Sequence, residues 1–418
     1  MARTTRVRYS IVALALVLNL VSYTDRVCIS VAAPKIRAEF GYSPTQMGFV
    51  FSIFSLAYFL FLTPWGVVAD RRGSRGLVPM AIFWWSVFTA LTAAAWNFVS
   101  LLVIRFVFGS LEAALSPAVA SAFTRWIPVS ERSTAFGAFS SGGRIGGTIA
   151  PPLAALLVLR FGWRSAFLTF AALGVVWALV WWFWYRDHPQ DHPRVSQQEL
   201  ELIQAGRPVS QEAAPAPRWG MLLRSRPLLS LLAVAFGYTF MWQFYITWFP
   251  TYLMEKRGFT LAQAGTYTGL PFLFGLIGNA LGGWVTDRIS RRFGIRAGRL
   301  SLGFTALILS AALLLSGVLH PGRNTAAVLL ALAAGFGDMV LGACWASAVE
   351  IGGKSAGAVS GLMNSASNFG GFVSPVLMGW VFDVWKDWNS VLFAAVAANV
   401  ISAFLWLGTQ PRSRELPS

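Results

Sequence analysis

Six ionisable side chains lie inside long apolar stretches of this 418-residue chain, and their chemistry needs an explanation first. They are Asp25, Arg26, Arg105, Glu112, Arg144 and Asp338. A charged side chain at the centre of a membrane-spanning helix costs roughly 2.5–3.5 kcal/mol even on lenient insertion scales, so such residues are functional candidates by default. A buried carboxyl group can carry a proton, and a buried guanidinium can bind an anion. The alternative is a structural network of ion pairs that only holds helices together.

The spacing of four of these residues predicts how they face one another. Arg105 and Glu112 are seven positions apart, which is two helical turns, so they should share one face about 10 Å apart along the axis. Asp25 and Arg26 are neighbours and should point about 100° apart, so each is free to meet another helix. We therefore expect two acids and two arginines to neutralise one another across a cavity.

Arg144 and Asp338 leave more than one interpretation open. Arg144 stands in "SGGRIGGTIAPP" with no acidic residue within ten positions on either side. Its partner is either the substrate itself or a fixed carboxylate such as Asp338 or Glu112. Asp338, in "GFGDMVLG", could be a further proton or cation site, cap a broken helix, or pair with Arg144.

The elements that must position these residues are membrane-spanning helices. The chain is 56% hydrophobic and only 12% charged, whereas soluble proteins are about 25% charged. Apolar runs of spanning length predict an all-α membrane protein with twelve transmembrane helices in two six-helix halves. The runs lie near residues 10–33, 47–69, 77–97, 99–124, 134–158, 165–185, 228–252, 263–285, 300–318, 325–349, 357–381 and 388–409.

The basic residues predict how the chain is oriented in the membrane. With the N-terminus in the cytoplasm, 22 of the 33 lysines and arginines fall in inner segments and 8 in outer segments. This bias follows the positive-inside rule, so it accounts for most of the net charge of +16 without a nucleic-acid partner. We expect a multi-pass protein of the cell inner membrane, embedded in the bilayer as a monomer, with both termini cytoplasmic. Cys28 and Cys344 both fall in apolar segments and predict no disulfide.

The chain divides into two halves around one polar stretch. We expect an N-terminal six-helix bundle over 1–185, a cytoplasmic linker over 186–227 and a C-terminal six-helix bundle over 228–418. In the linker, Ser196 and Glu199 have capping-box spacing and predict a short helix on the inner face. The segment "QEAAPAPR" that follows predicts a flexible connection.

The two halves repeat one another. "GVVADRRGSR" at 66–75 and "GWVTDRISRR" at 283–292 share G-x-x-x-D-R at a spacing of 217 residues. "RIGGTIAPP" at 144–152 and "NFGGFVSPV" at 368–376 match at a spacing of 224 residues, which pairs Arg144 with Asn368. Repeated halves of a transporter enclose a substrate site near the bilayer midplane. We therefore expect Arg144 and Asn368 to line a central cavity.

The loop after the second span resembles the signature G-x-x-x-D-R-x-G-x-R of the major facilitator superfamily. Every position of that signature is met, by Gly66, Asp70, Arg71, Gly73 and Arg75. The resemblance covers the whole chain and implies transport by alternating access. It favours Asp70, Arg71 and Arg75 as a latch that holds one conformation closed, repeated at Asp287 and Arg288. The alternative is a charge cluster that only sets topology.

The first and fourth spans narrow this resemblance to the anion:cation symporter family, whose bacterial members take up sugar acids and other organic anions with protons. The first span carries Tyr23, Asp25 and Arg26 as Y-x-D-R, and the fourth carries an arginine and a glutamate seven apart. The resemblance implies that Arg26 binds the substrate carboxylate. It implies that Asp25 and Glu112 take up protons, with Arg105 tied to them. It also implies a set of residues that line the substrate site: Tyr23, Tyr58, Trp345 and Asn364.

The chain departs from that pattern in two places. Where the galactonate carrier has a glutamine in its fifth span, this chain has Gly143 followed by Arg144, and the region around Gly342 and Cys344 lacks hydroxyl side chains. Fewer hydroxyl partners and one more cation predict a less hydroxylated acid, a dicarboxylate or an aromatic acid. In the seventh span, Trp242, Gln243 and Tyr245 could face the cavity, although aromatic-rich helices more often serve packing.

Other functions fit the sequence less well. An organophosphate antiporter of the same superfamily would have an arginine in the seventh span, and there is none between Arg226 and Lys256. A proton-coupled exporter of the superfamily stays open as an alternative. No catalytic motif supports an enzyme, and the three histidines fall in predicted loops. We expect no metal and no organic cofactor, with the proton as the coupling ion.

Overall fold

The computed structural model describes residues 5–204 and 224–409, and helices make up almost all of them. The first half contains α1 (Val7–Phe40), α2 (Pro44–Arg72), α3 (Ser74–Thr92), α4 (Phe98–Glu112), α5 (Leu115–Trp126), α6 (Arg132–Phe161) and α7 (Trp163–Trp184). The short helix α8 (Gln197–Gln204) follows. The second half contains α10 (Arg226–Thr247), α11 (Phe249–Glu255), α12 (Leu261–Phe293), α13 (Ile295–Leu319), α14 (Arg323–Asp338), α15 (Leu341–Gly352), α16 (Ala356–Trp385) and α17 (Trp388–Trp406).

These helices confirm the predicted all-α membrane fold. The pairs α4 and α5, α10 and α11, and α14 and α15 follow one another with at most a two-residue break, so each pair corresponds to one predicted span. Within the described residues, ten helical stretches are long and apolar enough to cross a membrane. The stretches α3 and α16 do not meet that measure. The many glycines, serines and asparagines of α16 lower its mean hydropathy, and they suit a helix that packs closely against α2 and α10.

The starts of α2 and α12 show how local sequence fixes the helices. Ser43 accepts a hydrogen bond from the backbone N–H of Gln46, whose side chain binds back to Ser43. Thr260 and Gln263 form the same reciprocal cap at the start of α12. Each cap satisfies backbone donors that a helix N-terminus leaves free. The two caps are 217 residues apart, which is the spacing of the repeated G-x-x-x-D-R motif.

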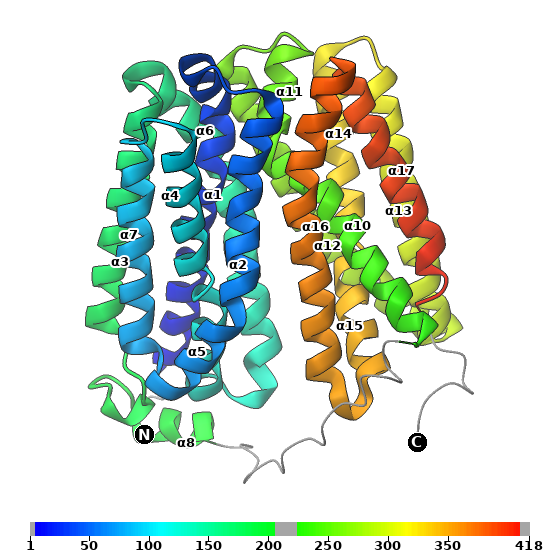
Figure 1. The fold of residues 1–418 in the computed structure, drawn as a ribbon. Helices are drawn as coiled ribbons and strands as arrows, with labels where there is room; N and C mark the ends of the chain where they lie inside the picture. The colour runs from blue at the N-terminus through cyan, green and yellow to red at the C-terminus, as the bar shows by residue number, and fades with distance from the viewer. Residues whose placement is uncertain (1–4, 205–223, 410–418) are drawn as a thin grey trace.

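The two halves lie closest together at one end of the helix bundle. Figure 1 shows α1 to α7 as one bundle and α10 to α17 as the other, with α8 at one end and α11 near the opposite end. We call these ends the α8 side and the α11 side. Contacts between the halves run mainly between α2 and α16 and between α6 and α12. From the α11 side towards the α8 side, the two bundles diverge (Figure 1).

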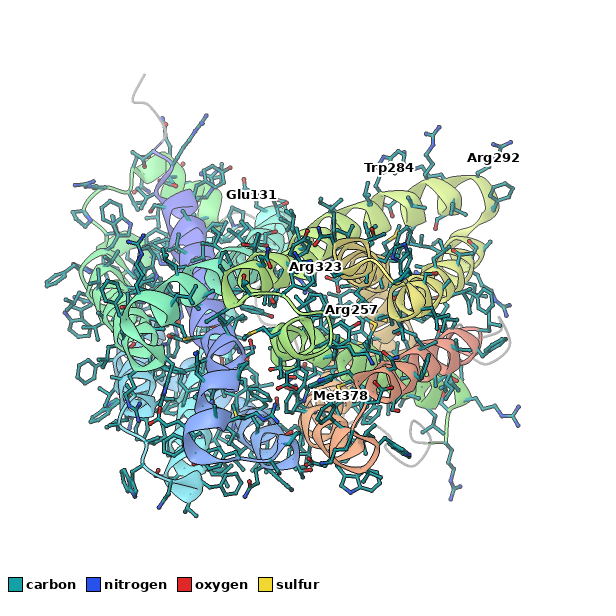
Figure 2. The ribbon with its side chains drawn as sticks, turned by 90° about the horizontal axis from the view of Figure 1, so that it is seen from above. Glu131, Arg257, Trp284, Arg292, Arg323 and Met378 are labelled. Carbon is teal, nitrogen blue, oxygen red and sulfur yellow. The ribbon has the colours of Figure 1, made fainter. Side chains whose placement is uncertain are left out.

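Polar contacts close the α11 side. Arg37 Nη1 lies 2.8 Å from Glu255 Oε1, and the backbone N–H of Thr45 donates to Asp383 Oδ2 at 2.8 Å. Seen from above, Figure 2 shows the helices of both halves side by side around the centre. Gly48 lets α2 approach α16, because a Cβ at this position would lie 2.5 Å from the carbonyl oxygen of Pro375. The glycine therefore permits a close contact between the two helices, because any larger side chain here would force them apart.

The helix α8 is fastened to the start of α1 by Glu199. Its buried carboxylate accepts hydrogen bonds from Thr5 Oγ1 at 2.6 Å and from the backbone N–H groups of Val7 and Arg8 at 3.0 Å each. Burial acts to raise the pKa of Glu199, but these hydrogen bonds and the charge of Arg8 outweigh it and leave the pKa below its ordinary value. The predicted helix in the linker thus corresponds to α8. The predicted flexible connection "QEAAPAPR" and both chain ends lie outside the described residues.

Candidate substrate site between the two halves

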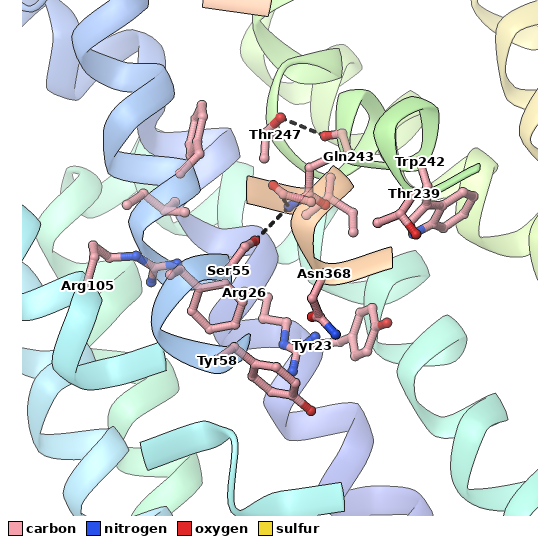
Figure 3. Close-up of a pocket in the computed structure, with 15 residues that line it drawn as sticks. Tyr23, Arg26, Ser55, Tyr58, Arg105, Thr239, Trp242, Gln243, Thr247 and Asn368 are labelled. Carbon is pink, nitrogen blue, oxygen red and sulfur yellow. Dashed lines mark hydrogen bonds between the residues drawn. The ribbon is translucent and has the colours of Figure 1, made fainter. Parts of the chain in front are cut away.

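A cavity of about 160 Å³ lies between the two halves. This is well below the roughly 300–1,000 Å³ of pockets that take drug-sized ligands, so the cavity suits a small molecule. Figure 3 shows side chains from both halves pointing into it. Its polar and aromatic lining comes from α1, α2, α4, α10 and α16: Tyr23, Arg26, Phe51, Phe54, Ser55, Tyr58, Arg105, Thr239, Trp242, Gln243, Thr247 and Asn368.

Arg26 is the cation in the centre of this lining. Its Nε donates to Glu112 Oε1 at 2.6 Å, and its guanidinium lies 4.9–5.2 Å from the ring centres of Tyr23, Phe54 and Tyr58. The side chain keeps 19% of its surface exposed, whereas that of Glu112 is fully buried. Figure 3 shows the guanidinium between the two tyrosines and facing Asn368. The arginine is therefore held from one side by a carboxylate and rings and faces the cavity with the other.

Behind Arg26, Glu112 and Asp25 differ in their partners. Glu112 Oε1 also accepts a hydrogen bond from the hydroxyl of Ser22. Asp25 is 1% exposed, and neither of its carboxylate oxygens has a hydrogen-bond partner among the described residues. Arg105 lies within electrostatic reach of both acids and stacks on Phe108, with 4.6 Å between its guanidinium and the ring centre. The structure thus brings together the four residues that the sequence predicts to neutralise one another.

Arg144 has a fixed carboxylate partner. Its Nη2 lies 2.6 Å from Asp338 Oδ2 and 3.2 Å from the hydroxyl of Tyr238, which in turn donates to Asp338 Oδ1 at 2.5 Å. The guanidinium stacks on Trp242 with 3.8 Å to the ring centre. Of the partners that the sequence leaves open for Arg144, the structure shows Asp338. Because α6 belongs to the first half and α10 and α14 to the second, this ion pair crosses between the halves. Arg144 itself lies behind Trp242 and is not among the residues that line the cavity, whereas Asn368 is.

Gln243 lines the cavity and makes a further contact between the halves. Its Nε2 donates to Ser55 Oγ at 3.2 Å and to the carbonyl oxygen of Gly371 at 3.4 Å. Trp242 lines the cavity next to it, whereas Tyr245 is buried and donates to the carbonyl oxygen of Leu330, a packing contact. Sequence reasoning did not select Ser55, Thr239 or Tyr238, because a lone hydroxyl residue in an apolar helix gives no distinguishing signal.

Of the other residues predicted to line the cavity, some do and some do not. Tyr58 lines the cavity and its hydroxyl lies 3.2 Å from Ser116 Oγ. Asn368 also lines it, and its amide donates to the backbone oxygen of Asn364 at 2.9 Å and to the side-chain oxygen of Asn364 at 3.3 Å. Asn364 thus lies one turn before Asn368 on α16 and is not among the residues that line the cavity. Trp345, on α15, is 43% exposed and does not belong to the lining of this cavity.

The predicted latch residues lie on the α8 side and are not brought together. Asp70, Arg71, Asp287 and Arg288 are exposed, and Arg75 lies over the ring of Trp182 within the first half. The start of α3 instead binds Asp187, whose Oδ1 accepts from the backbone N–H groups of Ser74 at 2.7 Å and Arg75 at 3.2 Å. Sequence reasoning missed Asp187, because it lies 112 residues beyond Arg75 in the linker.

The described residues contain no group of three histidine, cysteine or acidic side chains that could hold a metal ion. His192 is buried in the linker with its ring centre 5.6 Å from those of Trp126 and Trp184. The two indole rings around His192 indicate that its role is packing. The chemistry of the site therefore rests on arginines, carboxyl groups and aromatic rings.

Comparisons with known proteins agree with this arrangement. The family model described as Major Facilitator Superfamily matches residues 15–375. The chain is 36% identical to the "Probable sulfoacetate transporter SauU" of Cupriavidus necator, over 92% of this chain and 89% of the relative. It is 30% identical to the hexuronate transporter of Bacillus subtilis, over 92% and 90%. It is 32% identical to a "Probable galactarate/D-glucarate transporter" of the same organism, over 96% and 91%.

A solved structure has the same fold. It is that of a bacterial homolog of the human lysosomal transporter Spinster, in an inward-facing and unoccupied conformation. The TM-score is 0.79, with 97% of each chain covered and 20% sequence identity. At that identity, the likeness extends to the arrangement of the helices and not to the residues of the site.

Proposed function

Because the chain belongs to the major facilitator superfamily, and is a membrane transporter and not an enzyme, we propose that it imports a small organic anion together with protons by alternating access. The single observation that carries this proposal is Arg26, which faces a cavity between the halves while Glu112 and three aromatic rings hold it from behind. A guanidinium pairs with a carboxylate or sulfonate through charge-assisted hydrogen bonds, and the low-dielectric surroundings strengthen them.

The substrate class follows from the cavity and the relatives together. The relatives are named as transporters of sulfoacetate, hexuronate and galactarate or glucarate, all of which are organic acids. The cavity is small, and three aromatic rings, those of Tyr23, Phe54 and Tyr58, surround Arg26. These features favour a compact acid with few hydroxyl groups, of which sulfoacetate is an example.

Proton coupling would act through the carboxyl groups behind Arg26. Glu112 and the substrate compete for the same guanidinium, so a proton on Glu112 would free Arg26 for the anion. Asp25 is a second candidate, because its oxygens are buried without a hydrogen-bond donor among the described residues, a position that suits a neutral carboxylic acid. Release of the anion on the other side would let Glu112 lose its proton and pair with Arg26 again.

The halves would alternate around this site. The α11 side is closed by Arg37 with Glu255 and by Thr45 with Asp383, and we propose that it faces outward, with the α8 side and both termini in the cytoplasm. The latch residues Asp70 and Asp287 are exposed here, so they would bind across the halves in the opposite conformation. We propose a monomer in the cell inner membrane that needs no cofactor besides the proton.

Uptake into proteoliposomes tests this proposal. Purified protein is reconstituted, a pH gradient is imposed, and accumulation of labelled sulfoacetate, glucuronate, galactarate and benzoate is measured. We expect accumulation of at least one acid that disappears when the gradient is dissipated. Glu112→Gln should abolish accumulation driven by the gradient but leave exchange of internal for external substrate. Loss of both activities in a folded Glu112→Gln protein would contradict the coupling role.

A further inference from the structure

A second pair of charges lies behind one wall of the cavity, outside the residues that line it, and the transport cycle proposed above does not use it. Arg144 and Asp338 sit on the wall behind Trp242, and their contacts join α6 of the first half to α10 and α14 of the second. We propose that this pair is a second, proton-linked anion subsite, which takes the second acidic group of a substrate with two acidic groups. This inference rests on the proposed function and names the substrate class of the same site.

The geometry leaves Arg144 with unused binding capacity. Its Nη1 is buried and has no hydrogen-bond acceptor among the described residues, although Nη2 faces Asp338 and Tyr238. A buried donor without an acceptor is unfavourable, so a ligand oxygen that accepts a hydrogen bond from Nη1 would also relieve that cost. The guanidinium covers one face of Trp242, a residue that lines the cavity.

One aromatic ring connects the two arginines. The guanidinium of Arg26 lies 5.2 Å from the ring centre of Tyr23. The same ring packs against Gly143, where a Cβ would lie 2.6 Å from Tyr23 Cε2, and it is within electrostatic reach of Arg144. Figure 3 shows Tyr23 and Trp242 on the same side of the cavity. Arg26 and Arg144 are therefore both near the ring of Tyr23, one facing the cavity and the other behind Trp242.

The two ion pairs beside the cavity carry no net charge before the substrate enters. Arg26 and Arg144, both largely buried, each have one carboxylate as the direct partner: Arg26 has Glu112, and Arg144 has Asp338. An anion with one negative charge needs one proton to keep this sum, and an anion with two charges needs two. Because each proton neutralises the partner of one arginine, the number of freed arginines matches the number of acidic groups.

Among the described residues, few polar or charged groups surround Asp338, so few can affect its protonation. From α6 it meets Arg144, and from α10 it meets Tyr238 and, at longer electrostatic range, Tyr245. From α12 it meets the backbone at Gly275, where a Cβ would lie 2.5 Å from Asp338 Oδ2. A proton from the outer solution would convert the Asp338 carboxylate to a carboxylic acid, and Arg144 would bind the substrate's second acidic group. After release of substrate and proton to the cytoplasm, the ion pair would form again.

The test compares two anions of matched size in proteoliposomes. Sulfoacetate carries a carboxylate and a sulfonate, whereas isethionate carries the sulfonate and an uncharged hydroxymethyl group in place of the carboxylate. We expect the wild-type protein to move one more proton with each sulfoacetate than with each isethionate, measured from the pH gradient that balances a given substrate gradient. Asp338→Asn should remove that extra proton. Arg144→Gln should raise the KM for sulfoacetate about tenfold or more and that for isethionate less than about twofold.

Two further variants keep the test decisive. Arg37→Gln breaks a polar contact between the halves away from the cavity, so it should affect both anions equally. The double variant Arg144→Gln with Asp338→Asn leaves no unpaired charge, and it should lose the preference for sulfoacetate and keep isethionate uptake. Equal effects of Arg144→Gln on both anions, or equal proton numbers in the wild type, would overturn the inference while leaving anion import intact. Wild-type protein that accumulates neither of these anions but accumulates glucuronate or benzoate would overturn this inference alone, and wild-type protein that accumulates none of the acids tested would overturn both proposals.

Discussion

The two buried ion pairs near the cavity have similar chemistry but differ in position. One lies inside the first half, and the other joins the two halves. Arg26 and Glu112 both belong to the first half, so their distance of 2.6 Å does not have to change when the halves move as bodies. Arg144 and Asp338 are also 2.6 Å apart, but they belong to different halves. Only substrate and protons should break the first pair. The second pair should also break when the two halves move apart. The same difference separates Glu199, which fastens α8 to α1, from Arg37, which joins the halves at the α11 side.

The largest effect is expected for Arg26, because it is the cation that faces the cavity. Arg26→Gln should lower uptake of every transported anion by about a hundredfold or more, since loss of one member of a buried charge pair costs about 2–5 kcal/mol. Anion uptake under a pH gradient is the measurement. The matched control is Arg164→Gln, which removes an exposed arginine–glutamate pair with Glu39 in the same half and should leave uptake within about twofold. Substantial uptake by a folded Arg26→Gln protein would remove Arg26 from the substrate site.

Asp338→Asn should have the next largest effect, on stability. It leaves Arg144 largely buried without a carboxylate, which should lower the free energy of unfolding by about 3 kcal/mol. Thermal unfolding can be followed with a dye that reacts with exposed thiols, because Cys28 and Cys344 are both buried in the folded protein. The double variant with Arg144→Gln removes both charges and should recover much of the loss. A double variant less stable than Asp338→Asn would show that the two residues are not energetically coupled.

The sequence was sufficient for the fold, because apolar runs, charge bias and an internal repeat are properties of the chain alone. The all-α fold of membrane-spanning helices is confirmed, and so is the superfamily. The sequence also selected the six central charges, since a charge in an apolar helix stands out by its cost.

Which charges pair could not be predicted, because pairing depends on how helices from distant parts of the chain pack. Asp338 is 194 positions from Arg144, and three partners for Arg144 were open until the geometry fixed one. The placement of Trp345 outside the cavity lining depends on the rotation of α15, which no pattern of apolar residues specifies here. Ser55 and Tyr238 are ordinary residues in apolar helices, and only their neighbours make them part of a site.

Glu199 tests a contact inside one half, with a smaller effect on stability. Glu199→Gln should lower the free energy of unfolding by about 1–2 kcal/mol, because a carboxylate at a helix N-terminus accepts backbone N–H groups and favours the helix dipole. The pKa of Glu199 lies below its ordinary value, so this contribution is present above the unfolded pKa of about 4.3 and is lost as the pH falls through the folded pKa. The stability difference between variant and wild type should therefore be constant near neutral pH and shrink in acid. The ratio of the two conformations should not change.

Arg37 tests a contact between the halves, and its effect should be the smallest. Replacing it should change the ratio of the two conformations and leave stability nearly unchanged. Arg37 and Glu255 are partly exposed, so their pair contributes at most about 1 kcal/mol, which corresponds to a shift of up to about fivefold in the ratio of conformations. Arg37→Gln should favour the state that is open at the α11 side, because the pair exists only when that side is closed.

Spin labels at two exposed positions on the α11 side can measure this shift. Ala38 lies near the end of α1 and Asn324 near the start of α14, so labels on cysteines placed there report the separation of the halves. The native cysteines are buried and should not take up label. Arg37→Gln should increase the population at longer distances with little change in thermal stability, whereas Glu199→Gln should change stability and leave the distances as they are. If both variants moved both quantities equally, contacts inside a half and contacts between halves would not be separable, and the halves would not move as bodies.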